Sequence, residues 1–116
     1  MEDRVQSIKL TDKDTGEVYE LDFNRESVKF AEARDFTLNT IQDFPSTRIP
    51  ELFYYAFRMH HKNMAKNQTD KLLEKLGGLP GNVLGRLCDL YNQAGLTGVV
   101  ATEEEAAKNE MVDWEL

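Results

Sequence analysis

The segment from residue 48 to residue 63, RIPELFYYAFRMHHKN, places a wide band of apolar side chains along one helix. A helix with such a band either lies at the centre of the core or buries its excess apolar surface against another molecule. We therefore expect a central helix over about residues 48–66. The band consists of Ile49, Leu52, Phe53, Ala56, Phe57, His60 and Met64, and its flanks are Tyr54, Tyr55 and Met59.

Residues 6–23 alternate between apolar and polar side chains, which predicts a β-hairpin. Gly16 lies in the turn between the two strands and can adopt the positive φ that a bulged hairpin loop requires. An isolated two-stranded ribbon is only marginally stable in water, so the single apolar face of this hairpin needs helices to cover it.

Four helices are expected, separated by short breaks. Asn24 is expected to cap the first helix, and Ser46 or Thr47 the second. Gly77 and Gly78 are expected to cap the end of the third helix, and Gly95 is expected to close the last helix in the left-handed conformation. Residues 35–46 are expected to form a loop with room for one helical turn. The predicted helices span about residues 25–34, 48–66, 69–76 and 82–94.

These elements predict an α+β fold that is mainly α, with an N-terminal β-hairpin packed on about four helices. Residues 1–98 are expected to form a single globular domain, because 116 residues are enough for one core. Most of the formal net charge of −7 falls on the last residues, where acids are dense and core periodicity is lost. We expect residues 99–116 to form a mobile acidic tail.

Composition excludes several classes of function. Contact with duplex DNA or RNA needs a concentrated basic face, whereas this chain has 21 acidic and 14 basic residues. No apolar stretch approaches the roughly 18 residues of a membrane-spanning helix. The lone Cys88 and the absence of a secretion-type start indicate a cytoplasmic protein. We expect no nucleic-acid partner and no membrane association.

No residue pattern predicts an enzyme, a cofactor site or a metal site. His60 and His61 are adjacent, so they point about 100° apart on a helix and cannot jointly hold one metal ion. We expect a semi-buried His60 and a solvated His61. Cys88 occupies an apolar helical position, where burial raises the thiol pKa and disfavours the thiolate. The corner at residues 77–81 lacks the lysine and hydroxyl of a phosphate-binding loop.

Four apolar residues are candidates for binding a partner protein. Tyr54, Tyr55 and Met59 flank the predicted central helix, and Trp114 lies on the acidic tail. The alternative for the first three is an ordinary place in the core, which is the usual location of aromatic residues at helical spacing. The alternative for Trp114 is an unstructured chain end instead of a short docking segment.

Residues 6–95 resemble a family of small proteins from phages and prophages of Gram-positive bacteria that is similar to tail assembly chaperones. The resemblance lies in three segments, IKLTDKDTGEVYELDFNRESVKFAEAR, RIPELFYYAFRMHHKN and GGLPGNVLGRLCDLYNQ. It implies a non-enzymatic factor of long-tailed phages that coats the tape measure protein and keeps its apolar helices soluble. The factor then leaves as the tail tube protein polymerises.

The partners implied by this resemblance are the tape measure protein and the major tail protein, in the cytoplasm of an infected or lysogenic bacterial cell. The sequence leaves open whether the chain also forms a homo-oligomer through the same apolar face. The resemblance marks no individual binding residue. The alternatives are a small virion structural or head-to-tail connector protein, and a prophage protein that binds a host factor.

Overall fold

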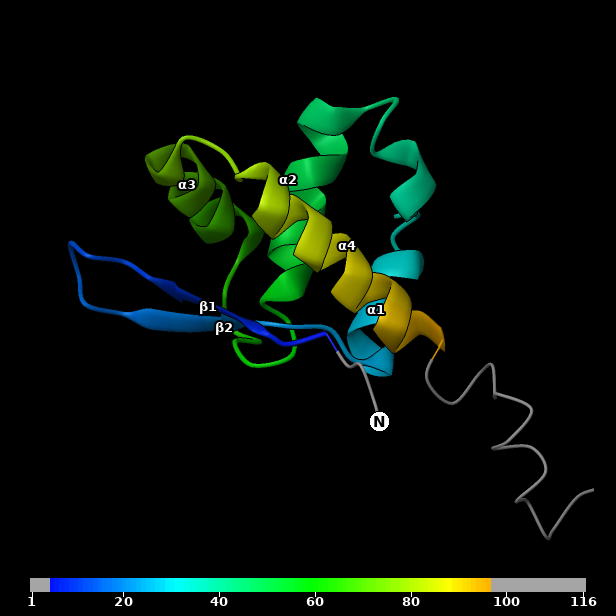
Figure 1. Ribbon diagram of the computed structural model, residues 1–116, viewed down its shortest axis with the longest axis horizontal. Helices are drawn as coiled ribbons and strands as arrows, with labels where there is room; N and C mark the ends of the chain where they lie inside the picture. The colour runs from blue at the N-terminus through cyan, green and yellow to red at the C-terminus, as the bar shows by residue number, and fades with distance from the viewer. Residues whose placement is uncertain (1–4, 97–116) are drawn as a thin grey trace, which may run out of the picture.

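The computed structural model describes residues 5–96, which form a β-hairpin followed by four α-helices (Figure 1). This confirms the predicted α+β fold that is mainly α. The predicted tail over 99–116, with Trp114, lies outside the described residues. The elements are β1 (Ile8–Thr11), β2 (Val18–Leu21), α1 (Arg25–Glu32), the 3₁₀ turn η1 (Leu38–Thr40), α2 (Pro45–Ala56), α3 (Lys66–Leu76) and α4 (Gly81–Leu96).

The hairpin forms as its sequence pattern predicts. β1 and β2 pair antiparallel, with Ile8 opposite Leu21 and Leu10 opposite Tyr19, so the apolar residues of both strands share one face. Gly16 has a φ of 79°, which confirms its predicted left-handed conformation in the loop. The apolar face of the hairpin is turned toward the helices, which lie on one side of it in Figure 1.

α1 begins where its capping residues predict. The Asn24 side chain accepts a hydrogen bond of 2.8 Å from the backbone N–H of Ser27. The Ser27 hydroxyl in turn accepts one of 2.9 Å from the backbone N–H of Asn24. This reciprocal capping box satisfies two amides that a helix start would leave free. The one helical turn expected between residues 35 and 46 is η1.

The central helix is shorter and earlier than predicted, because α2 spans residues 45–56 instead of 48–66. Neither Ser46 nor Thr47 caps it, since both lie inside its first turn. At its other end, the carbonyl of Ala56 accepts a hydrogen bond of 3.1 Å from the backbone N–H of Asp22. In a longer helix that carbonyl would bond the amide four residues on. The end of the hairpin therefore supplies the hydrogen-bond donor for a carbonyl at the C-terminal end of α2.

α3 begins at Lys66, earlier than the predicted start at residue 69. The Gln68 side chain accepts a hydrogen bond of 2.7 Å from the backbone N–H of Ala65 and so satisfies an amide at the helix start. The predicted glycine cap at the other end is confirmed. Gly77 has a φ of 76°, and the N–H of Gly78 donates to the carbonyl of Leu73 at 3.2 Å.

Gly95 does not close α4 in the left-handed conformation, because it lies within the helix, which continues to Leu96. A Cβ at this position would meet Val28 Cγ1 of α1 at 3.5 Å. Because 3.5 Å is an ordinary van der Waals distance, α4 approaches α1 closely here but an alanine would still fit. In Figure 1 these two helices lie together at the end of the molecule away from the hairpin loop.

The core is built around α2, which contacts α1, α3, α4 and η1. Four rings from different segments meet edge to face, with Phe36 placed 5.3 Å from Tyr55 and 5.5 Å from Tyr91, and Phe23 placed 5.2 Å from Tyr91. No helix within residues 5–96 has the length and apolar character needed to cross a membrane. The buried apolar residues are Leu21, Phe23, Val28, Ala31, Phe36, Leu52, Phe53, Tyr55, Ala56, Phe57, Leu72, Leu87, Leu90, Tyr91 and Ala94.

Candidate functional site

The core itself takes up most of the wide apolar band of the central helix. Leu52, Phe53, Ala56 and Phe57 are all at most 1% exposed. Tyr55 is 4% exposed and contacts the rings of Phe30 and Phe36. Tyr55 is thus a core residue, and it is not part of a surface that a partner could reach. The excess apolar surface expected along this helix is largely used within the domain.

The structure describes two of the three other predicted partner-binding residues. Tyr54 is half-buried in α2 and packs against the core. Met59 is half-buried in the turn that follows α2. Trp114 lies outside the described residues. The structure therefore leaves Tyr54 and Met59 as partly accessible side chains at the end of α2.

An apolar cleft lies between the hairpin and the corner that joins α3 to α4. It has a volume of about 490 Å³, within the range of pockets that hold small ligands or a few side chains. Phe53 of α2 contributes to the lining, and Lys9 is the one charged residue among those that line it. The lining residues are Ile8, Lys9, Leu10, Leu21, Phe53, Leu76, Gly77, Gly78, Leu79, Pro80 and Val83.

The cleft exists because helices cover only part of the apolar face of the hairpin. Leu21 is 1% exposed, whereas Ile8 and Leu10 on the neighbouring strand are only half-buried. Opposite these residues stand Gly77 and Gly78, which have no side chains to fill the space. Both have positive φ values, 76° and 101°, which glycine adopts readily and which close α3. Because the same two glycines line the cleft without side chains, this wall of the cleft is shallow.

Leu76 is an exposed apolar side chain of the lining. It is 41% exposed although it ends an amphipathic helix whose Leu72 is buried. Leu76 and Leu10 also line a second hollow of about 320 Å³ beneath the hairpin loop. Exposed leucines in a concave apolar surface are typical of sites that bind other molecules. The cleft is therefore the candidate site.

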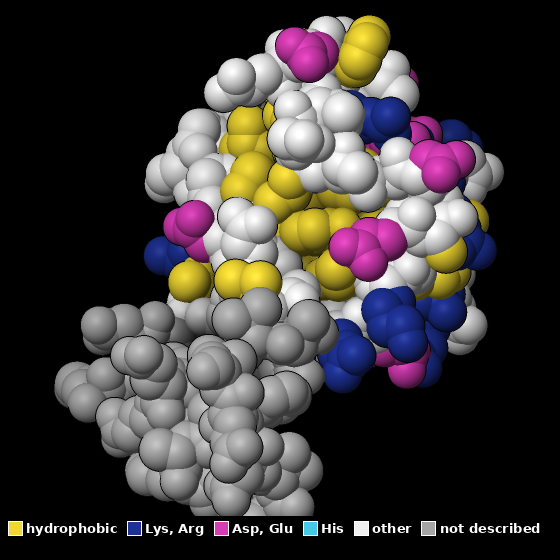
Figure 2. All heavy atoms as spheres, turned by 90° about the vertical axis from the view of Figure 1, so that its right-hand side faces the viewer, with side chains coloured by type: hydrophobic (Ala, Val, Ile, Leu, Met, Phe, Trp, Pro, Cys, Tyr) yellow, Lys and Arg dark blue, Asp and Glu magenta, His cyan; other side chains and the backbone are white. Residues whose placement is uncertain are grey.

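Hydrophobic side chains also gather at the centre of the face shown in Figure 2. On this side of the molecule lie α1, the segment after it and the C-terminal part of α4. Phe30 of α1 is covered by two guanidinium groups, with Arg34 Cζ 3.5 Å and Arg58 Cζ 3.8 Å from the ring centroid.

The two histidines have the reverse of their predicted environments. His60 is exposed, whereas His61 is half-buried and its Nε2 accepts a hydrogen bond of 3.0 Å from the backbone N–H of Glu20. The N–H of His61 donates to the carbonyl of Phe57 at 2.7 Å, and its ring packs against those of Tyr19 and Phe57, which accounts for its burial. Cys88 is half-buried, and burial together with nearby Asp89 raises the pKa of its thiol, in the direction predicted.

Sequence reasoning did not find the cleft, although two of its signals were present. The hairpin has one apolar face that needs cover, and the glycine-rich corner follows directly after Leu76. What the sequence could not show is that these two features face one another. That relation depends on how α3 packs against α2 and beneath the hairpin.

The family comparison gives a clear result. The chain belongs to the family described as Domain of unknown function (DUF5055), whose profile matches residues 1–116. Comparisons with curated proteins and with solved structures found no match. Membership in DUF5055 is thus established, and the function of this DUF5055 protein has to be argued from its own residues.

Proposed function

We propose that this DUF5055 protein is a non-enzymatic tail assembly chaperone, which binds apolar segments of a phage tape measure protein and keeps them soluble during tail tube assembly. The apolar cleft between the hairpin and the α3–α4 corner carries this proposal. The resemblance of residues 6–95 to phage assembly proteins supports it and supplies the identity of the partner. The cytoplasm of the infected or lysogenic cell is the proposed location.

The lining of the cleft is suited to reversible binding of an apolar helix. Its walls carry leucine, isoleucine and valine, so binding buries apolar area without requiring a specific polar partner. Its shallow glycine wall leaves the bound segment accessible from outside. A net charge of −7 opposes self-association of the loaded complex, since like charges repel. These properties fit a protein that must release its partner when the tube protein arrives.

The direct test is co-expression with a phage tape measure protein. We expect the tape measure protein to be largely insoluble alone and soluble when the DUF5055 chain is present. Leu76→Gln should reduce this effect strongly, because it places an amide in the apolar cleft. Leu96→Gln is the matched control, since Leu96 is 55% exposed at the end of α4 and does not line the cleft.

Two outcomes would contradict the proposal. The first is equal solubility of the tape measure protein with and without the chain. The second is a stoichiometric amount of the chain in purified virions, because an assembly chaperone leaves before the particle is complete. That second result would favour the structural or head-to-tail connector alternative. If Leu76→Gln solubilised the tape measure protein as well as the unmodified chain does, the cleft would not be the site that binds it.

A further inference from the structure

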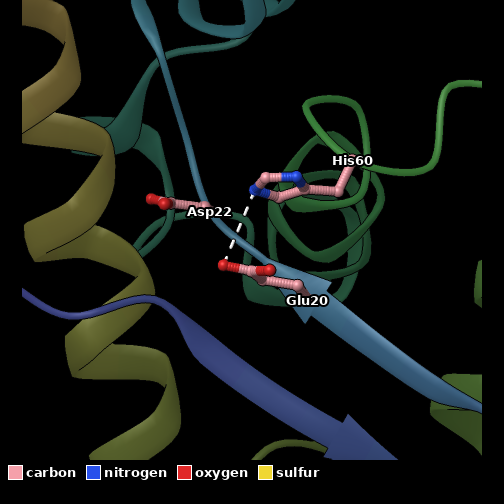
Figure 3. A group of neighbouring side chains, drawn as sticks. All are labelled: Glu20, Asp22 and His60. Atoms are coloured by element: carbon pink, nitrogen blue, oxygen red, sulfur yellow. Dashed lines mark ion pairs between the residues drawn. The ribbon is translucent and has the colours of Figure 1, made fainter.

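Two carboxylates at the end of β2 point to the same side of the chain. Glu20 and Asp22 are two residues apart in an extended segment, so their side chains leave the backbone in the same direction. Leu21 and Phe23, which alternate with them, are buried in the core. Glu20 and Asp22 are therefore directed away from the core, and both side chains extend to the same side in Figure 3.

His60 reaches these carboxylates because two hydrogen bonds, donated by backbone N–H groups at the end of the hairpin, join it to the end of α2 and the turn that follows. The N–H of Asp22 donates to the carbonyl of Ala56, and the N–H of Glu20 donates to His61 Nε2. Anchoring His61 in this way places its neighbour His60 over the strand. His60 Nε2 lies 3.7 Å from Glu20 Oε2, the pair joined by the dashed line in Figure 3, where the Asp22 carboxylate extends beyond the ring and points away from it.

The three side chains present donor atoms with the spacing of a metal site. One ligand atom from each of Glu20, Asp22 and His60 lies within 4.8 Å of the others. Ligands held about 2.0–2.2 Å from a zinc ion in a tetrahedral site are roughly 3.3 Å apart. All three side chains are at least partly exposed, so rotation about their side-chain bonds can close the remaining gap.

Neighbouring groups already orient two of the three side chains. The Ser7 hydroxyl donates to Glu20 Oε2 at 2.9 Å, and the N–H of Phe23 donates to Asp22 Oδ1 at 2.8 Å. Such outer hydrogen bonds are typical of carboxylates that bind metals, because they fix the position of the ligand atom.

An ion pair between His60 and Glu20 explains this arrangement less well. Charged hydrogen bonds between nitrogen and carboxylate oxygen are about 2.7–2.9 Å long, and the 3.7 Å separation here exceeds that range. One histidine also cannot neutralise two carboxylates. A dication placed among the three groups would balance both negative charges and would accept the lone pair of Nε2.

We propose that Glu20, Asp22 and His60 bind a divalent transition-metal ion of the zinc class, with the remaining coordination positions open to water. The imidazole selects such ions over Mg²⁺ and Ca²⁺, which prefer sites made of oxygen ligands only. The ion would join β2 to the turn after α2 and so strengthen the contact between hairpin and helices. This site is separate from the cleft, and its existence does not depend on the proposed chaperone function.

Calorimetric titration of the full chain with Zn²⁺ tests the proposal. We expect one site per chain, no comparable binding of Mg²⁺, and an affinity at least about tenfold weaker in His60→Gln and in Asp22→Asn. Glu17→Gln is the matched control, since Glu17 is an exposed carboxylate on the same hairpin and is not one of the three ligands. This variant should bind Zn²⁺ as tightly as the unmodified chain does.

A second measurement uses the unmodified protein, so it does not depend on whether a variant folds. Histidine nitrogen NMR should show Zn²⁺ shifting the Nε2 resonance of His60 while His61 keeps its hydrogen bond to Glu20. For the variants used in the titration, thermal unfolding in the presence of a chelator shows that each one is folded without metal. Either of two results overturns the proposal: no saturation below about 1 mM Zn²⁺, or an affinity that His60→Gln leaves unchanged.

Discussion

The ammonium group of Lys75 lies 2.9 Å from both carboxylate oxygens of Asp12 and 3.1 Å from Asp14 Oδ2. Lys75 belongs to the last turn of α3, whereas the two aspartates belong to the hairpin loop. The bridge therefore ties the tip of the hairpin to a helix that is distant in the sequence. Lys75, Asp12 and Asp14 all line the hollow beneath the loop, so this bridge fixes the distance between its walls. The next residue, Leu76, lines both this hollow and the cleft.

Asp12→Asn should destabilise the protein in a pH-dependent manner. The hydrogen bond from Lys75 is the main cause that lowers the pKa of Asp12, so the folded state favours the ionised carboxylate. The stabilisation is present above the unfolded pKa of about 4 and is lost as the pH falls through the lower folded pKa. Urea unfolding at a series of pH values should show a difference between the two proteins at pH 7 that shrinks toward zero in acid.

Asp14→Asn is the control for that comparison. Its side chain is 77% exposed, and it shares Lys75 with the much less exposed Asp12, so its loss should have a smaller effect. A destabilisation by Asp12→Asn that is the same at pH 7 and in acid would mean that the charge of Asp12 is not responsible.

His61→Phe should cost roughly 1–2 kcal/mol in free energy of unfolding. The substitution removes the acceptor for the part-buried N–H of Glu20 but keeps a ring against Tyr19 and Phe57. Chemical denaturation in metal-free buffer provides the measurement. His60→Gln in the same buffer should change the free energy of unfolding little, because His60 is exposed. Equal effects of the two substitutions would contradict the anchoring role of His61.

Local signals in the sequence predicted the parts of the fold that depend on nearby residues. The capping box of Asn24 and Ser27, the loop glycine Gly16 and the helix-closing Gly77 each act within a few residues along the chain. The alternation that predicts the hairpin is also local, and its register follows once the turn is set. These elements form at or close to their predicted positions.

The end of α2 could not be predicted, because a distant segment determines it. Apolar periodicity continues past Ala56, and nothing in residues 57–66 stops a helix as a proline would. The amide of Asp22 nevertheless donates to the carbonyl of Ala56, and that of Glu20 donates to His61 Nε2, so regular helix ends where the hairpin makes contact. One further bond of helical type, from the N–H of His61 to the carbonyl of Phe57, follows. The cluster of Glu20, Asp22 and His60 was missed for the same reason, since it depends on this contact between segments.

Two glycines of the α3–α4 region should respond to alanine in opposite ways. Gly85 lies inside α4, and a Cβ there would meet no atom within 4 Å, so Gly85→Ala should stabilise the protein by about 0.5–1 kcal/mol. Gly77 has a φ of 76°, and Gly77→Ala should cost roughly 1–2 kcal/mol because L residues are strained there. Thermal and urea unfolding of both variants provide the comparison. A gain in stability from Gly77→Ala would contradict the left-handed cap.

Tyr91 is a core residue whose ring and hydroxyl have opposite effects on stability. It is 6% exposed, and its ring packs edge to face with Phe23 and Phe36. Its buried hydroxyl has no hydrogen-bond partner among the described residues. Burial raises the pKa of this hydroxyl from about 10 to about 12. The ring therefore stabilises the core, while the hydroxyl carries an uncompensated desolvation cost.

Tyr91→Phe should stabilise the protein by about 1 kcal/mol at neutral pH, because it removes the unpaired hydroxyl and keeps the ring. Tyr91→Leu, which loses the ring contacts, should destabilise it. In the unmodified protein the raised pKa favours the neutral phenol in the folded state, so this contribution to stability is lost as the pH rises from about 10 to about 12. Urea unfolding across this range should show a weaker pH dependence for Tyr91→Phe. A loss of stability in that variant at pH 7 would indicate that the hydroxyl has a partner, such as a buried water.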